Sequence, residues 1–212
     1  MKKTSLLFLA AALLLTAAPV LSAKELADSP ASVPVLLGLE PVRQDLNVSS
    51  LQSALLDSLR AEFKAKAGVI VALGLADSKA APQAFLDLQT LRSRYNQRAL
   101  NVLNPSQQQR FRQIERQMLG GLLLTSPSEQ KLLGITPSQQ KHLTEIRSHD
   151  QAQAAAIMQR FNAGKISSFR KDIELHRNQH AAAQKMLAVL TPDQKKQWLG
   201  LTGPKLALPK TS

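Results

Sequence analysis

The chain has 212 residues, and its formal charge is +12 because 27 Lys and Arg stand against 15 Asp and Glu. A hydrophobic content of 44% over this length is enough for one or two modest domains with real cores. The absence of cysteine excludes disulfides, thiol chemistry and attachment as a lipoprotein.

The N-terminal stretch has the order of charge, apolar core and small residues that is typical of a secretory signal peptide. Two lysines precede an apolar run over residues 6–20, small residues follow up to Ala23, and no acid occurs before Glu25. An uncleaved membrane anchor is the alternative, but the run is short for a span and Pro19 lies near its end. We therefore predict a signal peptide over residues 1–23 and a periplasmic or secreted protein.

The predicted mature chain keeps a charge of +10, because cleavage removes Lys2 and Lys3 and no acid. Outside the cytoplasm, this charge does not indicate a nucleic-acid partner. We expect anionic envelope surfaces, such as lipid head groups and acidic polymers, or acidic stretches of unfolded envelope proteins as counterparts. Alternatively, the charge only keeps the protein soluble.

The first predicted elements follow a flexible leader over residues 24–34. Short helical turns are expected from Val35, and they lead into a helix that starts at Ser49. The apolar segment 68–76 could be a strand, but no partner strand is evident, so we interpret it as a bend with buried side chains. A second helix is predicted over residues 81–102.

Four helix starts carry the same capping box, in which a capping residue is followed three positions later by glutamine. The cap side chain accepts a bond from a first-turn amide, and the glutamine side chain reaches back to the amide of the cap. The four pairs are Ser49 with Gln52, Asn104 with Gln107, Thr136 with Gln139, and Thr191 with Gln194. A further start is predicted at Ser126, with Glu129 in the glutamine position.

The boxes belong to an internal duplication with an offset of 87 residues. The segments 101–111 and 188–198 are near-copies, and the two boxes of each half are 55 residues apart. The offset pairs Phe111 with Trp198, which we interpret as repeated core anchors.

The duplication predicts two tandem helical units, over residues 35–121 and 122–204, and a flexible tail over residues 205–212. In the first unit, the helix that opens at Asn104 is expected to end at the Gly120–Gly121 pair. The fold class is all-α.

The second unit is predicted to contain a helical hairpin, with arms over residues 137–161 and 166–189 and a turn near Gly164. An apolar seam on the second arm, from Ile166 through Phe169 to Leu190, contains His176 and His180. We favour a polar layer that fixes the register of the two helices. A metal site is a weaker alternative, because histidines at this spacing can share an ion, and a pH-sensitive seam is a third. We expect no cofactor.

Catalytic signals are lacking. Glu62, Glu115, Glu145 and Glu174 are scattered along helices among basic residues, as is usual for solvated helix faces. No serine stands in a nucleophile-elbow sequence, and no glycine-rich phosphate loop is evident. We therefore predict that the protein is not an enzyme.

The residues 190–194, Leu-Thr-Pro-Asp-Gln, match the LTxxQ signature of the Spy and CpxP family of periplasmic proteins, which the chain resembles. Residues 135–139 and 103–107 are close variants, and residues 48–52 are a looser fourth copy. Members of that family typically carry two such motifs in an all-helical chain, so four suggest a tandem duplication.

The resemblance implies an ATP-independent chaperone that holds unfolding clients on a basic, partly apolar helical surface, or an envelope-stress protein. Basic side chains that could attract acidic clients are Arg110, Arg112, Arg116, Arg170 and Lys171. The alternative is a non-catalytic structural or adaptor protein that binds one partner. The chain departs from the family in its duplication and its few methionines. One duplicated chain could supply the two halves that a dimer of the family supplies, which predicts a monomer, and a homodimer is the alternative.

Overall fold

The computed structural model describes residues 33–77 and 79–206. Helices make up all the regular structure of these residues, and no strand occurs among them, which confirms the all-α prediction. No helix in the described part is long and apolar enough to cross a membrane. The predicted signal peptide, and the leader up to residue 32, lie outside the described residues.

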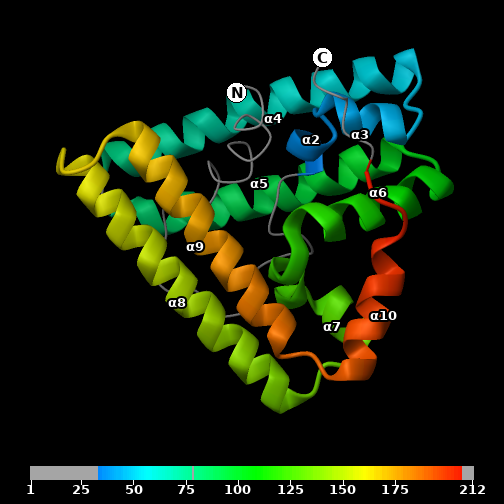
Figure 1. Cartoon of the computed structure of the whole chain (residues 1–212). Helices are drawn as coiled ribbons and strands as arrows, with labels where there is room; N and C mark the ends of the chain where they lie inside the picture. Colours follow the sequence, from blue (N-terminus) through cyan, green and yellow to red (C-terminus); the bar gives the residue numbers. More distant parts are fainter. Residues whose placement is uncertain (1–32, 78, 207–212) are drawn as a thin grey trace. The chain divides into compact units, whose positions relative to one another are not determined.

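The chain forms two compact units (Figure 1). The described part of the N-terminal unit consists of residues 33–117 together with 202–206, and the C-terminal unit consists of residues 118–201. The division after residue 117 lies slightly before the boundary that the duplication suggests. In addition, residues 202–204 belong to the N-terminal unit, whereas the duplication predicted them in the second.

The N-terminal unit begins with two short helices, α2 (Val33–Leu36) and α3 (Glu40–Asp45). The long helices α4 (Ser50–Ala76) and α5 (Ala81–Val102) then pack along each other as a hairpin, as Figure 1 shows. Helix α6 (Pro105–Leu119) follows and ends where the glycine pair begins. Gly120 has φ +53°, a left-handed conformation that glycine adopts without steric cost.

The C-terminal unit has the same order of elements. The 3₁₀ helix η1 (Gly120–Thr125) and α7 (Pro127–Leu133) precede the hairpin of α8 (Pro137–Asn162) and α9 (Ser168–Ala188), and α10 (Pro192–Thr202) follows. The helices α8, α9 and α10 each start 87 residues after α4, α5 and α6.

Side-chain contacts repeat with the same offset. Arg43 Nε donates to the carbonyl of Leu37 at 2.6 Å, and 87 positions later Gln130 Nε2 donates to the carbonyl of Leu124 at 2.9 Å. In both units, the residue two positions before the first capping residue, Ser49 or Thr136, has a left-handed backbone conformation. It is Asn47 in one (φ +49°) and Gly134 in the other (φ +60°). Asparagine is one of the few residues that tolerate this conformation.

The cores of the two units also correspond. Leu56 and Leu143 lie at equivalent positions on the first long helices, and each is 1% exposed. Phe111 and Trp198 are both buried, which confirms that these aromatics are core residues. Each therefore anchors the last helix of its repeat to the core.

One predicted element is wrong. Residues 68–76 do not form a bend with buried side chains, because α4 continues without interruption to Ala76. Val69 and Leu73 are 61% and 60% exposed. Glycine within a helix costs only about 1 kcal/mol relative to alanine, so Gly68 and Gly74 do not end it.

Candidate functional site

All four predicted capping boxes are present in the structure. In each box the amide of the glutamine donates to the cap side chain, and the amide of the cap residue donates to the glutamine Oε1. The lengths are 3.2 and 3.0 Å for Ser49 with Gln52, 2.9 and 2.9 Å for Asn104 with Gln107, 3.3 and 3.0 Å for Thr136 with Gln139, and 3.3 and 3.0 Å for Thr191 with Gln194.

The fifth predicted box, at Ser126, is wrong. Ser126 precedes α7 but makes no side-chain capping bond, and its hydroxyl lies 2.8 Å from that of Ser128. The amide of Ser126, which a box would pair with Glu129, donates instead to the carbonyl of Leu123 at 2.8 Å.

The glutamines of the boxes also bond to one another, a contact that was not predicted. Gln52 Nε2 donates to Gln107 Oε1 at 2.8 Å, and Gln107 Nε2 donates to Gln52 Oε1 at 3.1 Å. In the C-terminal unit, the corresponding distances between Gln139 and Gln194 are 2.6 and 3.2 Å. We call each reciprocal pair a glutamine lock.

Each lock also reaches the backbone. Gln52 Nε2 donates to the carbonyl of Val102, and Gln107 Nε2 donates to that of Leu46, at 2.8 and 3.1 Å. Gln139 and Gln194 make the same contacts with Val189 and Leu133, at 3.0 and 3.1 Å. A lock thus joins the first turns of two helices to the chain segments that precede them. Because carboxamides do not titrate or transfer protons, this arrangement is suited to holding the fold rather than to catalysis.

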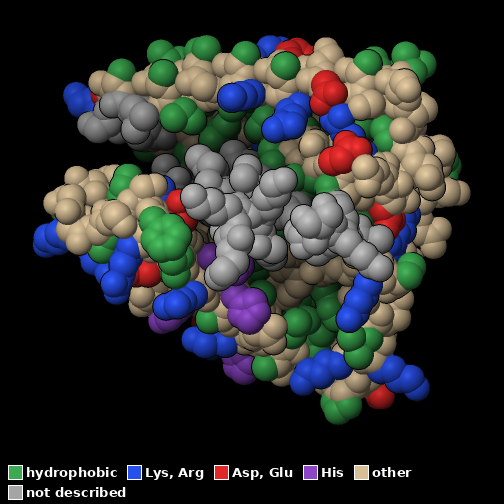
Figure 2. Space-filling view, turned by 45° about the horizontal axis from the view of Figure 1, so that its top comes forward, with side chains coloured by type: hydrophobic (Ala, Val, Ile, Leu, Met, Phe, Trp, Pro, Cys, Tyr) green, Lys and Arg blue, Asp and Glu red, His purple; other side chains and the backbone are tan. Residues whose placement is uncertain are grey.

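The predicted client-binding residues fall in different units, and the structure does not bring them into one site. Arg110, Arg112 and Arg116 lie on α6 of the N-terminal unit, whereas Arg170 and Lys171 lie on α9 of the C-terminal unit. On the face shown in Figure 2, Lys and Arg side chains are separated by acidic and neutral residues rather than forming one continuous basic surface.

Arg110 bonds to two other segments of the N-terminal unit that are distant from it in sequence. Its Nε and Nη2 donate to the two carboxylate oxygens of Asp45, at 2.5 and 2.9 Å, and its Nη1 donates to the carbonyl of Pro204 at 2.8 Å. The hydrogen bonds that Arg110 donates to Asp45 raise the pKa of Arg110 above its ordinary value. This guanidinium is therefore committed to contacts within its own unit.

The other four basic side chains differ in how far they reach solvent. Arg112 pairs with the buried Glu115 at 2.9 Å, and Arg116 is half-buried. Lys171 pairs with Asp172 at 3.1 Å, and its ammonium lies 4.6 Å from the centre of the Phe161 ring.

Arg170 bonds to Glu174 at 2.9 Å, but its side chain remains 71% exposed. Arg170 is the most exposed of the five basic side chains, since those of Arg110, Arg112 and Lys171 are 18%, 35% and 20% exposed and Arg116 is half-buried.

The end of the α4–α5 hairpin exposes a group of apolar side chains, which we call the apolar hairpin end. Its members Val69, Val71, Leu73 and Leu86 are 61%, 44%, 60% and 39% exposed. Lys64 and Lys66 lie within about two turns of it on α4 and are exposed. The positions 87 residues after the first three hold Ala156, Met158 and Arg160, so the C-terminal unit has no equivalent patch at these positions.

The apolar seam predicted for α9 is not the face of this helix that is buried. His176 and His180 are exposed, with ring centres 6.4 Å apart, and Phe169 is 75% exposed. The buried stripe consists instead of Leu175, Ala182 and Met186. The described residues contain no group of three or more His, Cys, Asp or Glu that could hold a metal ion.

A polar layer does occur in this hairpin, but other residues form it. Asn178 Nδ2 donates to Asp150 Oδ1 at 2.7 Å and to the Asp150 carbonyl at 2.9 Å, while Arg147 Nη1 lies 3.4 Å from Asp150 Oδ2. Burial raises the pKa of the Asp150 carboxyl, against the opposing charges of Arg147 and His149. Burial likewise lowers the pKa of Arg147, which is 5% exposed.

Comparison with known proteins gave no significant match to a family model, to a curated protein or to a solved structure. Function must therefore be argued from the residues themselves.

Proposed function

We propose that the chain is an exported, ATP-independent chaperone of the Spy type, which holds unfolding clients on exposed apolar and basic helical surface. The observation that carries the proposal is the apolar hairpin end, where four large apolar side chains are accessible. Val69 and Leu73, which lie one turn apart on the same face of α4, offer adjacent apolar surface to another chain.

The charge of the chain supports the same function. The charge of +10 on the predicted mature chain attracts acidic segments over distances near the Debye length, about 8 Å at physiological ionic strength. Arg170 and the lysines near the hairpin end present such charge to solvent. Electrostatic attraction then speeds encounter, and apolar contact retains the client.

The test is suppression of aggregation of two unrelated unfolding proteins by the chain from Lys24 onward, without ATP, at low and high salt. We expect both clients to be protected, with less protection at high salt. The double variant Val69→Gln, Leu73→Gln should protect less, because it removes apolar surface while keeping residues that favour a helix.

A matched control is the double variant Leu51→Gln, Leu199→Gln. Its side chains are 73% and 70% exposed but lie outside the hairpin end. Equal loss of protection in both double variants would contradict a role for the hairpin end. No protection by the unmodified chain at several-fold molar excess would contradict the chaperone proposal and favour an adaptor with a single partner.

A further inference from the structure

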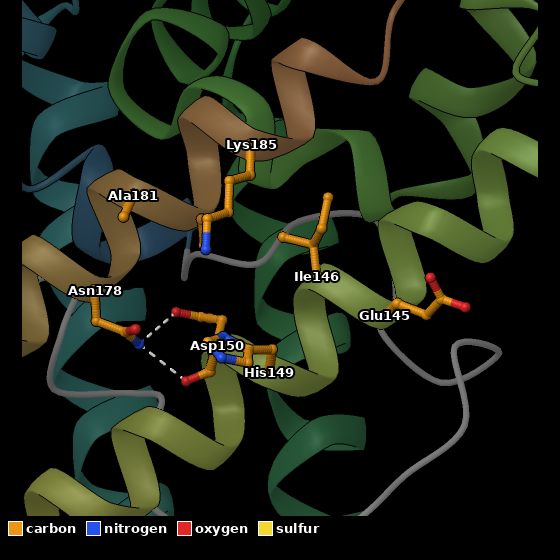
Figure 3. Close-up of a pocket in the computed structure, with 8 residues that line it drawn as sticks. Glu145, Ile146, His149, Asp150, Asn178, Ala181 and Lys185 are labelled. Atoms are coloured by element: carbon orange, nitrogen blue, oxygen red, sulfur yellow. Dashed lines mark hydrogen bonds between the residues drawn. The ribbon is translucent and has the colours of Figure 1, made fainter.

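A cavity of about 230 Å³ lies between α8 and α9 in the C-terminal unit (Figure 3). Residues that line it are Ile146, His149 and Asp150 on α8, and Asn178, Ala182 and Lys185 on α9. An apolar cavity of about 150 Å³ is known to take up a benzene molecule, so this space is large enough for one aromatic ring.

The repeat shows what fills the same place in the N-terminal unit. The positions 87 residues before Asp150 and Ala182 hold Phe63 and Tyr95. Their side chains are buried, with ring centres 5.6 Å apart and planes at 53°. The C-terminal unit has the same pair of helices but neither ring. Two residues that line the cavity, Asp150 and Ala182, therefore stand at the positions where the other repeat has an aromatic pair.

A basic residue is present beside the aromatic pair and at the equivalent position on the rim of the cavity. Arg98 lies over the Tyr95 ring, with 4.9 Å between its guanidinium carbon and the ring centre. The equivalent residue is Lys185, and Figure 3 shows its side chain extending from α9 toward Asp150. A ring in the cavity would therefore meet a cation, as Tyr95 does.

One wall of the cavity carries a carboxylate at the position where the N-terminal unit has an apolar ring. Asp150 takes the place of Phe63, is 3% exposed, and is held in position by Asn178. A carboxylate oxygen has several acceptor sites, so Asp150 can accept a further bond from a hydroxyl of a bound ring. Bonds of this charge-assisted type are stronger than those between neutral groups.

We infer that the cavity is a binding site for a phenol ring, namely a tyrosine side chain presented by a partner polypeptide. The ring packs on Ile146 and Ala182, the ammonium of Lys185 faces it, and its hydroxyl donates to Asp150. This site belongs to the C-terminal unit, whereas the apolar hairpin end belongs to the N-terminal unit, and the inference does not depend on the proposed chaperone function.

The inference is tested by titrating the ¹⁵N-labelled chain with p-cresol, toluene and the peptide Gly-Gly-Tyr-Gly-Gly, followed by NMR. We expect p-cresol and the peptide to shift the signals of Asn178 and Ala182, and toluene to bind about tenfold more weakly. Ala182→Tyr should abolish these shifts, because it supplies the ring that the N-terminal unit has at this position. Ala188→Tyr adds the same side chain at an exposed position of α9 and should leave binding unchanged.

Asp150→Asn keeps the shape of the site but removes the charge, so it should reduce the preference for p-cresol over toluene. Absence of shifts with millimolar p-cresol would overturn the inference, as would shifts that persist in Ala182→Tyr once its thermal unfolding shows a folded chain. Equal binding of toluene and p-cresol would overturn the role of Asp150. Binding of p-cresol without binding of the peptide would overturn the polypeptide source.

Discussion

Gln52 and Gln107 donate carboxamide hydrogen bonds to each other, at 2.8 and 3.1 Å, while each also completes the cap of its own helix. One residue type thus serves two purposes. It satisfies the amide of the cap residue, and it connects two helix starts that are 55 residues apart in sequence.

We expect Gln107→Ala to lower the free energy of unfolding by about 2 kcal/mol, because several half-buried polar groups lose partners at once. Gln52→Ala should act similarly, and the double variant should cost about 1 kcal/mol less than the sum of the single variants. Urea unfolding of the three variants measures this coupling. Gln97→Ala, which removes an exposed glutamine, is the control and should change stability by less than about 0.5 kcal/mol. Strict additivity would show that the lock contributes no mutual stabilisation.

We expect Arg110→Gln to destabilise the protein by about 1.5–3 kcal/mol, because Asp45 would lose its charged partner in a largely buried setting. Arg170→Gln should cost less than about 0.5 kcal/mol, since its pair with Glu174 is solvent-exposed on the Arg170 side. Thermal unfolding of both variants makes the comparison. Equal effects would contradict the assignment of Arg110 to the fold and of Arg170 to accessible surface.

Phe111→Ala and Trp198→Ala are each expected to lower the unfolding free energy by about 3–5 kcal/mol, because both remove a large buried side chain. Since the residues lie in different units, amide hydrogen exchange should be accelerated chiefly in the unit that carries the substitution. Uniform acceleration across both units in both variants would show that the two units unfold as one.

Acid is expected to weaken the hairpin of the N-terminal unit. The hydrogen bond from Lys66, with contributions from Tyr95 and Arg98, lowers the pKa of Glu62 from 4.5 to about 2. Between these values the unfolded chain binds the proton more readily, so this contribution to stability is present above pH 4.5 and is lost as the pH falls toward 2. Glu62→Gln should flatten this part of the curve of unfolding free energy against pH. An unchanged slope in the variant would contradict the assignment.

Much of the fold could be predicted because caps and repeats are local or periodic features. Thr136 and Gln139 indicate a helix start independently of the tertiary contacts around them. The exposed stretch from Val69 to Leu73 could not be placed from its hydrophobicity, because apolar residues remain at the surface when no element of their own unit covers them.

The prediction of the buried face of α9 was wrong for a related reason. A stripe through His176 and one through Leu175 differ by one residue, about 100° of helix rotation, and the half-buried Asn178 makes the true stripe of α9 look polar. The glutamine locks were missed because capping boxes are read one helix at a time. The equal spacing of 55 residues between boxes was the signal that could have revealed them.

The N-terminal unit is discontinuous in sequence. Gln117 Nε2 donates to the carbonyls of Thr202 and Pro204, at 2.6 and 2.7 Å, and Gln117 Oε1 accepts from the amide of Leu206 at 2.8 Å. The C-terminal unit is thus inserted in the sequence between α6 and residues 202–206, which bond to α6. On the ribosome, residues 202–206 are made after the whole inserted unit, so the part of the protein that is synthesised first is the last to be completed. A chain truncated before residue 202 would leave α6 without this cover however well the remainder had folded.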